Sequence, residues 1–325
     1  MAKFQLARWG EWVHPSAAEV LAQADVAEVP VPEGGSPVDL DMACEALYIR
    51  APHIASAEVI ASLSDLRLIA VPGAGLEIVD LDAATARGIP VLHGRGFGSR
   101  AVAEWVIGAM VWLARDVSAM DRAVRDGHWA VRHRAEGRRD LASLKLGVIG
   151  FGQIGRLVAQ KASTAFGSAV LVTETVPRVA DGARELGFQV VELETLLKNA
   201  DIVSVNAAAS HRFQSLLDGH RIRLIGGDGY LINTARGQLV DLETLAAALE
   251  DGGLGGAAID VYPEEPPPAA VLESLKRHPR VLLSPHAAGM TSDAVRALAV
   301  GVASSIVHAL SGGRPANCAN PEVWR

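Results

Sequence analysis

The sequence predicts an α/β protein made of two doubly wound domains, each with its own parallel sheet. The chain has 325 residues, more than the roughly 250–300 at which a single core stops growing, so two domains are expected. Short apolar runs alternate with helix-forming segments, as in parallel sheets covered on both faces. A glycine loop at residues 150–155 begins far enough along the chain to leave room for a complete α/β unit before it.

Residues 1–96 predict the first α/β unit. Its apolar runs are bounded by turn-forming residues, and Pro72-Gly73 ends one of them. Strands are expected over 4–6, 46–49, 68–71 and 89–92, and helices over 17–24, 57–63 and 80–87.

A long helix over 102–124 and a polar, arginine-rich loop over 132–140 lead to the second unit. The same alternation then continues, which predicts a second parallel sheet. Its strands are expected at 146–149, 169–173, 202–205, 230–233, 257–261 and 281–284, with helices between them and a last helix over 293–310.

Composition and charge exclude several classes of protein. Half of the residues are hydrophobic and the net charge is −7 at pH 7, whereas nucleic-acid binding needs a basic surface. Cys44 and Cys318 cannot form a metal cluster alone, so we expect no metal and a reduced pair. The N-terminus lacks a basic segment leading into an apolar one, and the apolar stretch 105–114 is too short to span a bilayer. We therefore expect a soluble, cytoplasmic protein without a membrane partner.

The glycine loop predicts a dinucleotide site because it follows a strand and opens a helix. Its first glycine permits the turn, the second lets a pyrophosphate approach the backbone, and the third allows close packing of helix on strand. N–H groups at the helix N-terminus would bind the phosphates. We therefore expect cofactor contacts from Gly150, Gly152, Gln153, Ile154 and Gly155.

Glu174 follows the next strand, about 20 residues past the glycines, where dinucleotide folds place the acid that binds the ribose. Such a carboxylate accepts hydrogen bonds from both ribose hydroxyls and repels a 2′-phosphate, which favours NAD over NADP. Arg178 could pair with a 2′-phosphate and keeps NADP open. An ordinary solvated carboxylate at a strand end is the other interpretation of Glu174.

Three later strands end in charged residues: Arg236, then Asp260 and Glu265, then His286. Ligands of open α/β sheets bind beyond the carboxyl ends of the strands, so these groups should converge beside the nicotinamide. A guanidinium matches a carboxylate with paired, charge-assisted bonds. A histidine can protonate the alkoxide that forms when a hydride adds to a ketone. Taken alone, His286 would be interpreted as a residue that caps a turn.

Further motifs accompany these residues: Pro72-Gly73-Ala74-Gly75-Leu76, Ser99-Arg100-Ala101-Val102-Ala103-Glu104, Asn233-Thr234-Ala235-Arg236-Gly237, Ala258-Ile259-Asp260-Val261 with Glu265-Pro266, Ser284-Pro285-His286 and Asn320-Pro321-Glu322. With them the chain resembles the D-isomer-specific 2-hydroxyacid dehydrogenase family, near the phosphoglycerate dehydrogenases and glyoxylate–hydroxypyruvate reductases, over nearly its whole length. The resemblance implies Arg236 as carboxylate binder, His286 as acid–base and Glu265 as its partner. It also implies that Asp260 bonds the nicotinamide carboxamide and that Ala235 contacts the cofactor.

The resemblance implies a Rossmann cofactor domain, residues 97–289, inserted into a flavodoxin-like substrate domain, residues 1–96 and 290–325. The implied activity is that of an NAD(H)-dependent D-2-hydroxyacid dehydrogenase that works mainly as a 2-oxoacid reductase. In the family the apolar helix around 105–114 forms a dimer interface, so a homodimer is expected. The regulatory domain that some relatives carry after the final helix is not expected here.

The substrate loop is expected at Gly73, Ala74 and Gly75, whose free N–H groups would hold a carboxylate as an anion nest. A plain tight turn is the alternative. Arg50 stands where relatives with phosphorylated or dicarboxylic substrates place an arginine, although it could equally be a surface residue. Arg95 adds positive charge in a segment that departs from the family pattern, so the substrate stays open.

Two other functions remain open at this point. One is a nucleotide-sensing binding protein like the corepressor branch of the family, which keeps Arg236, Glu265 and His286. The other is a dehydrogenase of an inorganic or one-carbon donor, such as phosphite or formate. Turnover of a 2-oxoacid would distinguish the first function from both.

Overall fold

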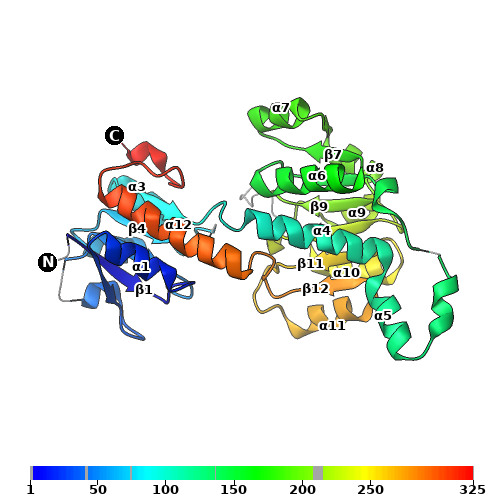
Figure 1. Cartoon of the computed structure of the whole chain (residues 1–325), viewed down its shortest axis with the longest axis horizontal. Helices are drawn as coiled ribbons and strands as arrows, with labels where there is room; N and C mark the ends of the chain where they lie inside the picture. Colours follow the sequence, from blue (N-terminus) through cyan, green and yellow to red (C-terminus); the bar gives the residue numbers. More distant parts are fainter. Residues whose placement is uncertain (1–2, 41–42, 74, 136, 208–214, 325) are drawn as a thin grey trace. The chain divides into compact units, whose positions relative to one another are not determined.

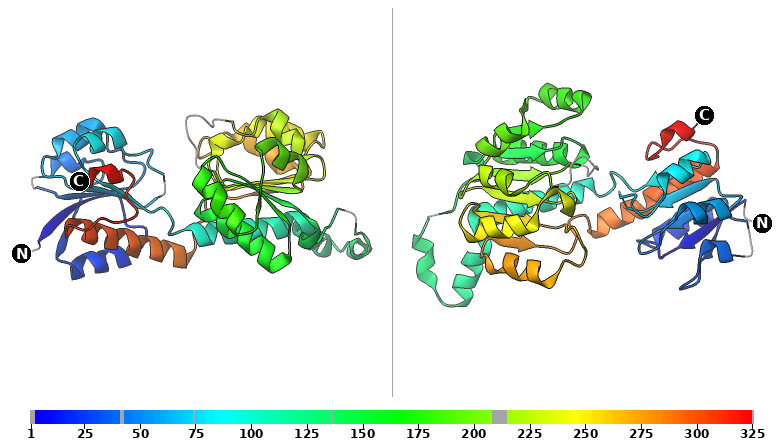
Figure 2. Two further views of the ribbon diagram at one scale, coloured as in Figure 1. Left: turned by 90° about the horizontal axis from the view of Figure 1, so that it is seen from above. Right: turned by 180° about the vertical axis from the view of Figure 1, so that it is seen from behind.

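The computed structural model of the chain describes residues 3–40, 43–73, 75–135, 137–207 and 215–324. It divides into two compact units, unit 1 (Met1–Gly98 with Met290–Arg325) and unit 2 (Ser99–Gly289). The chain passes from unit 1 to unit 2 between Gly98 and Ser99 and returns between Gly289 and Met290. Each unit contains one sheet covered by helices on both faces (Figures 1 and 2).

The sheet of unit 1 is fully parallel, with the strand order β2-β1-β3-β4-β5. This is the order of the flavodoxin-like fold, with its switch point between β1 and β3. Sequence analysis missed β2, because this edge strand is mostly half-buried and is not an apolar run. The strands are β1 (Phe4–Trp9), β2 (Val26–Pro30), β3 (Ala46–Ile49), β4 (Leu68–Val71) and β5 (Val91–His93).

Helices α1 (Ser16–Gln23) and α12 (Ser292–Leu310) pack together on one face of this sheet, and α2 (Ala57–Ser62) and α3 (Leu81–Ala86) cover the other. Within the described residues, α12 is long and apolar enough to cross a membrane by length and composition alone. Its residues Val302, Ala303 and Ile306 are nevertheless 0–1% exposed, against the strands of unit 1. The core of unit 1 thus accounts for much of its apolar character.

Asn320, in the Asn320-Pro321-Glu322 motif, has a structural role in unit 1. Its side chain is buried; Oδ1 accepts from the N–H of Val91 at 2.8 Å, and Nδ2 donates to Ile89 O and Thr85 Oγ1, both at 2.9 Å. The tail therefore satisfies backbone groups around the edge strand β5, which would otherwise be buried without partners. Short 3₁₀ turns, Pro37–Asp39 and Pro321–Val323, complete unit 1.

The sheet of unit 2 has seven parallel strands in the order β12-β11-β10-β9-β6-β7-β8. Counted from β6, this is the Rossmann order with one further strand, and the switch point lies between β6 and β9. The short edge strand β8 was not predicted. The strands are β6 (Leu146–Ile149), β7 (Val170–Thr173), β8 (Gln189–Val190), β9 (Ile202–Val205), β10 (Tyr230–Asn233), β11 (Gly256–Ile259) and β12 (Val281–Leu283).

Two hydrophobic clusters hold the helices of unit 2 to its sheet. One face carries α4 (Ser99–Arg115), α6 (Gln153–Phe166) and α7 (Pro177–Glu185). The opposite face carries α8 (Leu193–Asn199), α9 (Gly219–Ile225), α10 (Leu242–Glu250) and α11 (Ala269–Arg277). Short 3₁₀ turns lie at Trp129–His133, Leu141–Ser143 and Gly237–Leu239.

The prediction of one helix over 102–124 was wrong. The helix ends at Arg115, and a separate helix α5 (Val117–Arg125) follows. Asp116 between them has φ of 50°, the left-handed conformation that aspartate tolerates better than most residues. Its carboxylate lies 3.5 Å from Nη2 of Arg280. No glycine or proline marks this break, so the sequence pattern did not reveal it.

Candidate active site

The glycine loop connects β6 to α6, and the reasons for its three glycines differ. Gly150 has φ of +86°, and a Cβ there would lie 2.7 Å from the Cα of Ala207. A Cβ at the buried Gly155 would overlap the carbonyl oxygen of Gly150. The fold therefore requires both residues to be glycine. A Cβ at the exposed Gly152 would meet nothing within 4 Å, so the described protein atoms do not explain that glycine.

The N-terminus of α6 fits the pyrophosphate of a dinucleotide. Gly152 is its N-cap residue, and no side chain in the described part of the chain caps the first turn. The N–H groups of Gln153 and Ile154 are thus among those that an α-helix leaves without an intrahelical partner. Together with the helix dipole they favour an anion, and the missing Cβ at Gly152 lets it approach closely.

Glu174 lies directly after β7 and is tied to the glycine loop. Its Oε2 accepts from the N–H of Phe151 at 2.8 Å, and its Oε1 accepts from the N–H groups of Thr175 and Val176 at 2.8 and 2.9 Å. These bonds hold the carboxylate beside the loop and leave acceptor capacity for a ribose hydroxyl. Arg178 is exposed in the first turn of α7.

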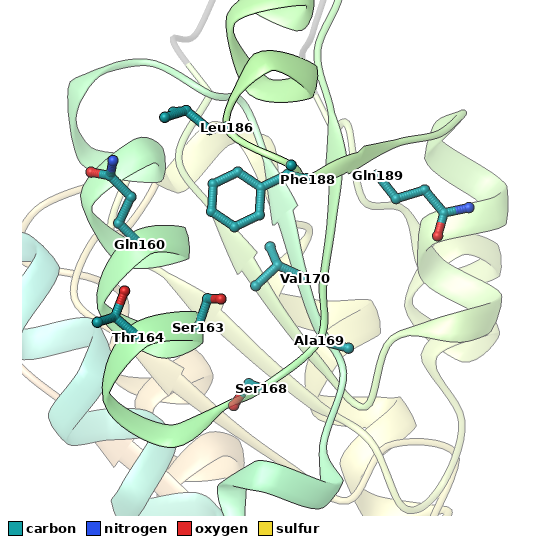
Figure 3. Close-up of a pocket in the computed structure, with 10 residues that line it drawn as sticks. Gln160, Ser163, Thr164, Ser168, Ala169, Val170, Leu186, Phe188 and Gln189 are labelled. Atoms are coloured by element: carbon teal, nitrogen blue, oxygen red, sulfur yellow. The ribbon is translucent and has the colours of Figure 1, made fainter.

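Unit 2 also contains a cavity of about 480 Å³, which lies away from the glycine loop and Glu174 (Figure 3). It is lined by Gln160, Ser163 and Thr164 of α6 and by Ser168 and Phe188, among others. It reaches the amino end of β7, whereas Glu174 follows the carboxyl end of that strand. Its lining holds no charged side chain, so it does not match the dinucleotide site.

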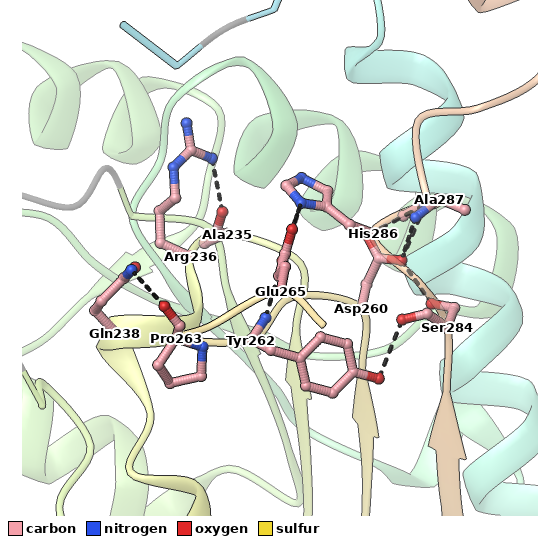
Figure 4. A network of polar contacts seen from close by, with 11 residues as sticks. Ala235, Arg236, Gln238, Asp260, Tyr262, Pro263, Glu265, Ser284, His286 and Ala287 are labelled. Carbon is pink, nitrogen blue, oxygen red and sulfur yellow. Dashed lines mark hydrogen bonds and ion pairs between the residues drawn. The ribbon is translucent and has the colours of Figure 1, made fainter. Parts of the chain in front are cut away.

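The predicted catalytic residues follow three neighbouring strands, β10, β11 and β12, at the same edge of the sheet (Figure 4). The Nδ1 atom of His286 lies 2.9 Å from Oε2 and 3.1 Å from Oε1 of Glu265. An ionised carboxylate can only accept, so the ring must carry its proton on Nδ1. This leaves Nε2 as the atom that can give or take a proton. The two side chains are 52% and 39% exposed, which makes Nε2 accessible to a substrate.

Asp260 holds the loop that carries His286. His286 has φ of 52°, and its N–H donates to the Asp260 carbonyl at 2.8 Å. The next N–H groups, of Ala287 and Ala288, donate to Oδ1 at 2.7 and 3.1 Å, and the Ser284 hydroxyl donates to the same atom at 2.6 Å. Successive N–H groups thus form a nest around a carboxylate that is itself buried. The predicted contact of Asp260 with the nicotinamide carboxamide stays a prediction.

Arg236 follows a turn that Asn233 shapes. The Asn233 side chain accepts from the N–H of Ala235 and donates to the Arg236 carbonyl, both at 3.1 Å. Arg236 is half-buried, and its Nη1 donates to the Ala235 carbonyl at 2.8 Å. Ala235 is buried and contributes to this local geometry; its predicted contact with the cofactor stays a prediction.

The predicted substrate residues belong to unit 1. Arg50 is exposed after β3, and its N–H donates to the Trp9 carbonyl at 3.1 Å. Gly73 and Gly75 follow the neighbouring strand β4, so they lie at the same edge of that sheet. Ala74 lies outside the described residues. Arg95 is exposed after β5.

Sequence analysis missed the roles of Tyr262 and Ser284. The hydroxyl of Tyr262 donates to the Ser284 carbonyl at 3.1 Å, and its N–H donates to Oε1 of Glu265 at 3.1 Å. The signal available in the sequence was a tyrosine between the two acids Asp260 and Glu265, and a serine two residues before the histidine.

A Rossmann-type sheet with a glycine loop, an acid directly after the next strand, and an arginine and a glutamate–histidine pair after neighbouring strands is the arrangement typical of a nicotinamide-dependent dehydrogenase. Comparisons with known proteins identify the family. Residues 107–288 match the model described as D-isomer specific 2-hydroxyacid dehydrogenase, NAD binding domain. The glyoxylate reductase of Korarchaeum cryptofilum is 32% identical over 283 residues, 86% of this chain and 84% of that protein. The chain belongs to the D-isomer-specific 2-hydroxyacid dehydrogenase family and is an NAD-dependent oxidoreductase that acts on CH–OH groups.

Solved structures agree with this assignment. The TT0316 protein of Thermus thermophilus is 29% identical, with a TM-score of 0.82, and the match covers 97% of this chain and 99% of that one. A 2-hydroxyacid dehydrogenase of Ketogulonicigenium vulgare is 27% identical, with a TM-score of 0.81 and 98% of both chains covered. The predicted fold class and family are therefore confirmed.

Proposed function

We propose that the protein reduces a small 2-oxoacid to the D-2-hydroxyacid, with Arg236, Glu265 and His286 as its catalytic residues. The observation that carries this proposal is the Glu265–His286 pair, with Nδ1 bound to the carboxylate and Nε2 available for proton transfer. NADH, when bound, supplies the hydride to the carbonyl carbon of the substrate.

The residues of the chain supply binding and the proton. The guanidinium of Arg236 binds the substrate carboxylate and orients the adjacent ketone. Nε2–H of His286 donates its proton to the ketone oxygen as negative charge develops there, a step typically worth about 10²–10⁴-fold in rate. Glu265 accepts from Nδ1–H throughout, which fixes the tautomer and stabilises the imidazolium that gives up the proton. In the oxidation direction, neutral Nε2 takes the hydroxyl proton.

Unit 2 is proposed as the cofactor domain, with Gly152, Gln153 and Ile154 at the pyrophosphate and Glu174 at the ribose. Unit 1 is proposed as the substrate domain. The anion-binding groups that it offers are the N–H groups after β4 and the exposed Arg50. A substrate with a second acidic group would use Arg50 or Arg95.

We also propose a cytoplasmic homodimer. Support for association comes from apolar side chains around α5 that are strongly exposed: Val117, Val124 and Trp129 at 40%, 55% and 62%. Exposed apolar groups that lie near each other mark association surfaces. Light scattering at micromolar concentration tests this proposal, and a monomer would refute it.

The experiment that tests the function is NADH oxidation, followed by absorbance, with glyoxylate, hydroxypyruvate, phosphohydroxypyruvate, phenylpyruvate and 2-oxoglutarate. The panel is repeated with NADPH. Turnover of one or more of these acids supports the proposal, and preference for a phosphorylated or dicarboxylic one implicates Arg50 or Arg95. Tight NADH binding without turnover of any of them would refute it.

A further inference from the structure

Tyr262 connects the three loops that carry the proposed catalytic residues. Its N–H donates to Oε1 of Glu265 at 3.1 Å, and its phenol hydroxyl donates to the carbonyl of Ser284, two residues before His286, at 3.1 Å. Figure 4 shows the ring lying below Glu265 and Asp260, with its hydroxyl directed at the chain that leads to His286. The residue is only 7% exposed.

The backbone of Tyr262 is also held against the turn that carries Arg236. A Cβ added at Gly237 would overlap the carbonyl carbon of Tyr262 and the nitrogen of Pro263, so the two segments approach as closely as glycine permits. The side-chain amide of Gln238 adds a bond to the Pro263 carbonyl at 3.3 Å. The position of Tyr262 is therefore fixed from a third side.

The phenol of Tyr262 keeps its proton at neutral pH and acts as a donor. Burial, and then the negative charges of Asp260 and Glu265, raise its pKa above the ordinary value for tyrosine. Its possible acceptors are the carbonyls of Ser284 at 3.1 Å and Ile259 at 3.5 Å. The shorter bond links the loop after β11 to the end of β12, which carry the two members of the acid–base pair.

We propose that Tyr262 is a positioning residue, which holds Glu265 and His286 at the separation needed for proton transfer at Nε2. This inference rests on the proposed function and assigns Tyr262 a role through the pair rather than on the substrate. Without the phenol bond, the loop after β12 can move away from Glu265, and a longer Nδ1–carboxylate distance stabilises the protonated ring less.

The test is Tyr262→Phe, which removes the hydroxyl and keeps the ring and the backbone N–H. We expect kcat for the best 2-oxoacid to fall about three- to tenfold, the effect of one neutral hydrogen bond. KM and the NADH dissociation constant should change by less than about twofold. The alkaline midpoint of the kcat/KM profile should move to lower pH, because the loosened pair loses its proton more easily. An unchanged kcat and pH profile would overturn the proposal.

Tyr230→Phe is the matched control. Tyr230 is 2% exposed, and its hydroxyl is contacted by Arg280 at 3.3 Å at the amino end of β10, away from the catalytic loops. This variant should lower the thermal midpoint and leave the pH profile unchanged. A second control is Tyr262→Phe in a Glu265→Gln background, where no further loss of kcat is expected because the charge that stabilises the protonated ring is already absent. A full additional loss of kcat in this double variant would show that Tyr262 does not act through the Glu265–His286 pair, and would overturn the proposal.

A second readout does not depend on turnover. Diethyl pyrocarbonate modifies neutral imidazole, and mass spectrometry of the peptide containing His286 gives its rate as a function of pH. In Tyr262→Phe the rate should rise at lower pH than in the wild type. Identical rate profiles would overturn the inference, even if no 2-oxoacid is reduced. Failure of the proposed function is seen separately, as absence of turnover in the wild type.

Discussion

Alanine at two glycines of the same loop should affect different properties: Gly150→Ala should lower the stability of the fold, and Gly152→Ala should lower the affinity for NADH. This difference tests the cofactor site. At Gly150 the fold itself requires glycine, because φ is +86° and a Cβ would lie 2.7 and 2.8 Å from the Cα and N of Ala207. At Gly152 the backbone is extended, with φ of −68° and ψ of −163°, and a Cβ has open space. An alanine at Gly152 should therefore disturb the bound dinucleotide and not the fold.

The magnitudes follow from this geometry. Gly150→Ala combines a left-handed alanine, about 1–2 kcal/mol, with a backbone clash of about 1–3 kcal/mol. We therefore expect the free energy of unfolding to fall by about 2–5 kcal/mol. For Gly152→Ala, alanine is a poorer N-cap than glycine, but it also restricts the unfolded chain. These effects oppose each other, so stability should change by less than about 1 kcal/mol. Loss of one charge-assisted bond to the pyrophosphate, about 1.5–3 kcal/mol, raises the NADH dissociation constant about 10- to 150-fold.

The assays are thermal unfolding and titration of NADH by its fluorescence. Gly182→Ala is the matched control, because this glycine lies on α7 of the same unit and a Cβ there also meets nothing within 4 Å. It should bind NADH like the wild type. Wild-type NADH affinity in Gly152→Ala would refute the placement of the pyrophosphate. Wild-type stability of Gly150→Ala would refute the steric argument.

Three further predictions concern other parts of unit 2. His286→Ala should lower kcat about 10²–10⁴-fold in steady-state assays and leave NADH affinity within about twofold; unchanged turnover would exclude the proposed acid–base role. Glu174→Gln removes the charge that repels a 2′-phosphate, so the ratio of kcat/KM for NADH over NADPH should fall about tenfold, and an unchanged ratio would place cofactor choice elsewhere. Arg223 hydrogen-bonds Asp251 and lowers the pKa of its carboxyl, so the pair stabilises the fold above the unfolded pKa and loses this contribution as the pH falls through the folded value. The thermal midpoint of Asp251→Asn should therefore lie below that of the wild type at pH 7 and converge with it in acid, whereas a constant difference would contradict the linkage.

Several strands in which every residue is buried were predicted with their exact bounds. β6, β9 and β10 begin and end at the expected residues, because a strand covered on both faces is a continuous apolar run. The edge strands β2 and β8 escaped prediction because half of their environment is solvent. The break at Asp116 escaped because it depends on a left-handed aspartate without a glycine or proline beside it.

The candidate site shows the same division between chemistry and conformation. Charged residues at the ends of consecutive strands can be found from sequence, because parallel strands end at one edge, and the structure brings Glu265 and His286 to hydrogen-bonding distance. The role of Asp260 depended on something no pattern contains: His286 adopts a left-handed conformation, which turns the next N–H groups onto the carboxylate. A histidine gives no sign of this conformation, whereas a glycine would.

In the loop that carries His286, the two carboxylate oxygens of Asp260 have different hydrogen-bond partners. Among the described residues, Oδ1 of Asp260 accepts from Ser284, Ala287 and Ala288, while Oδ2 accepts from the N–H of Ala288, at 3.2 Å. One oxygen thus keeps the loop in its left-handed conformation, and the other retains acceptor capacity toward an incoming amide. The backbone conformation costs on the order of 1–3 kcal/mol for a residue such as histidine. The bonds to the buried Asp260 carboxylate and the bond from Tyr262 to the Ser284 carbonyl offset that cost, while the imidazole itself is held by Glu265.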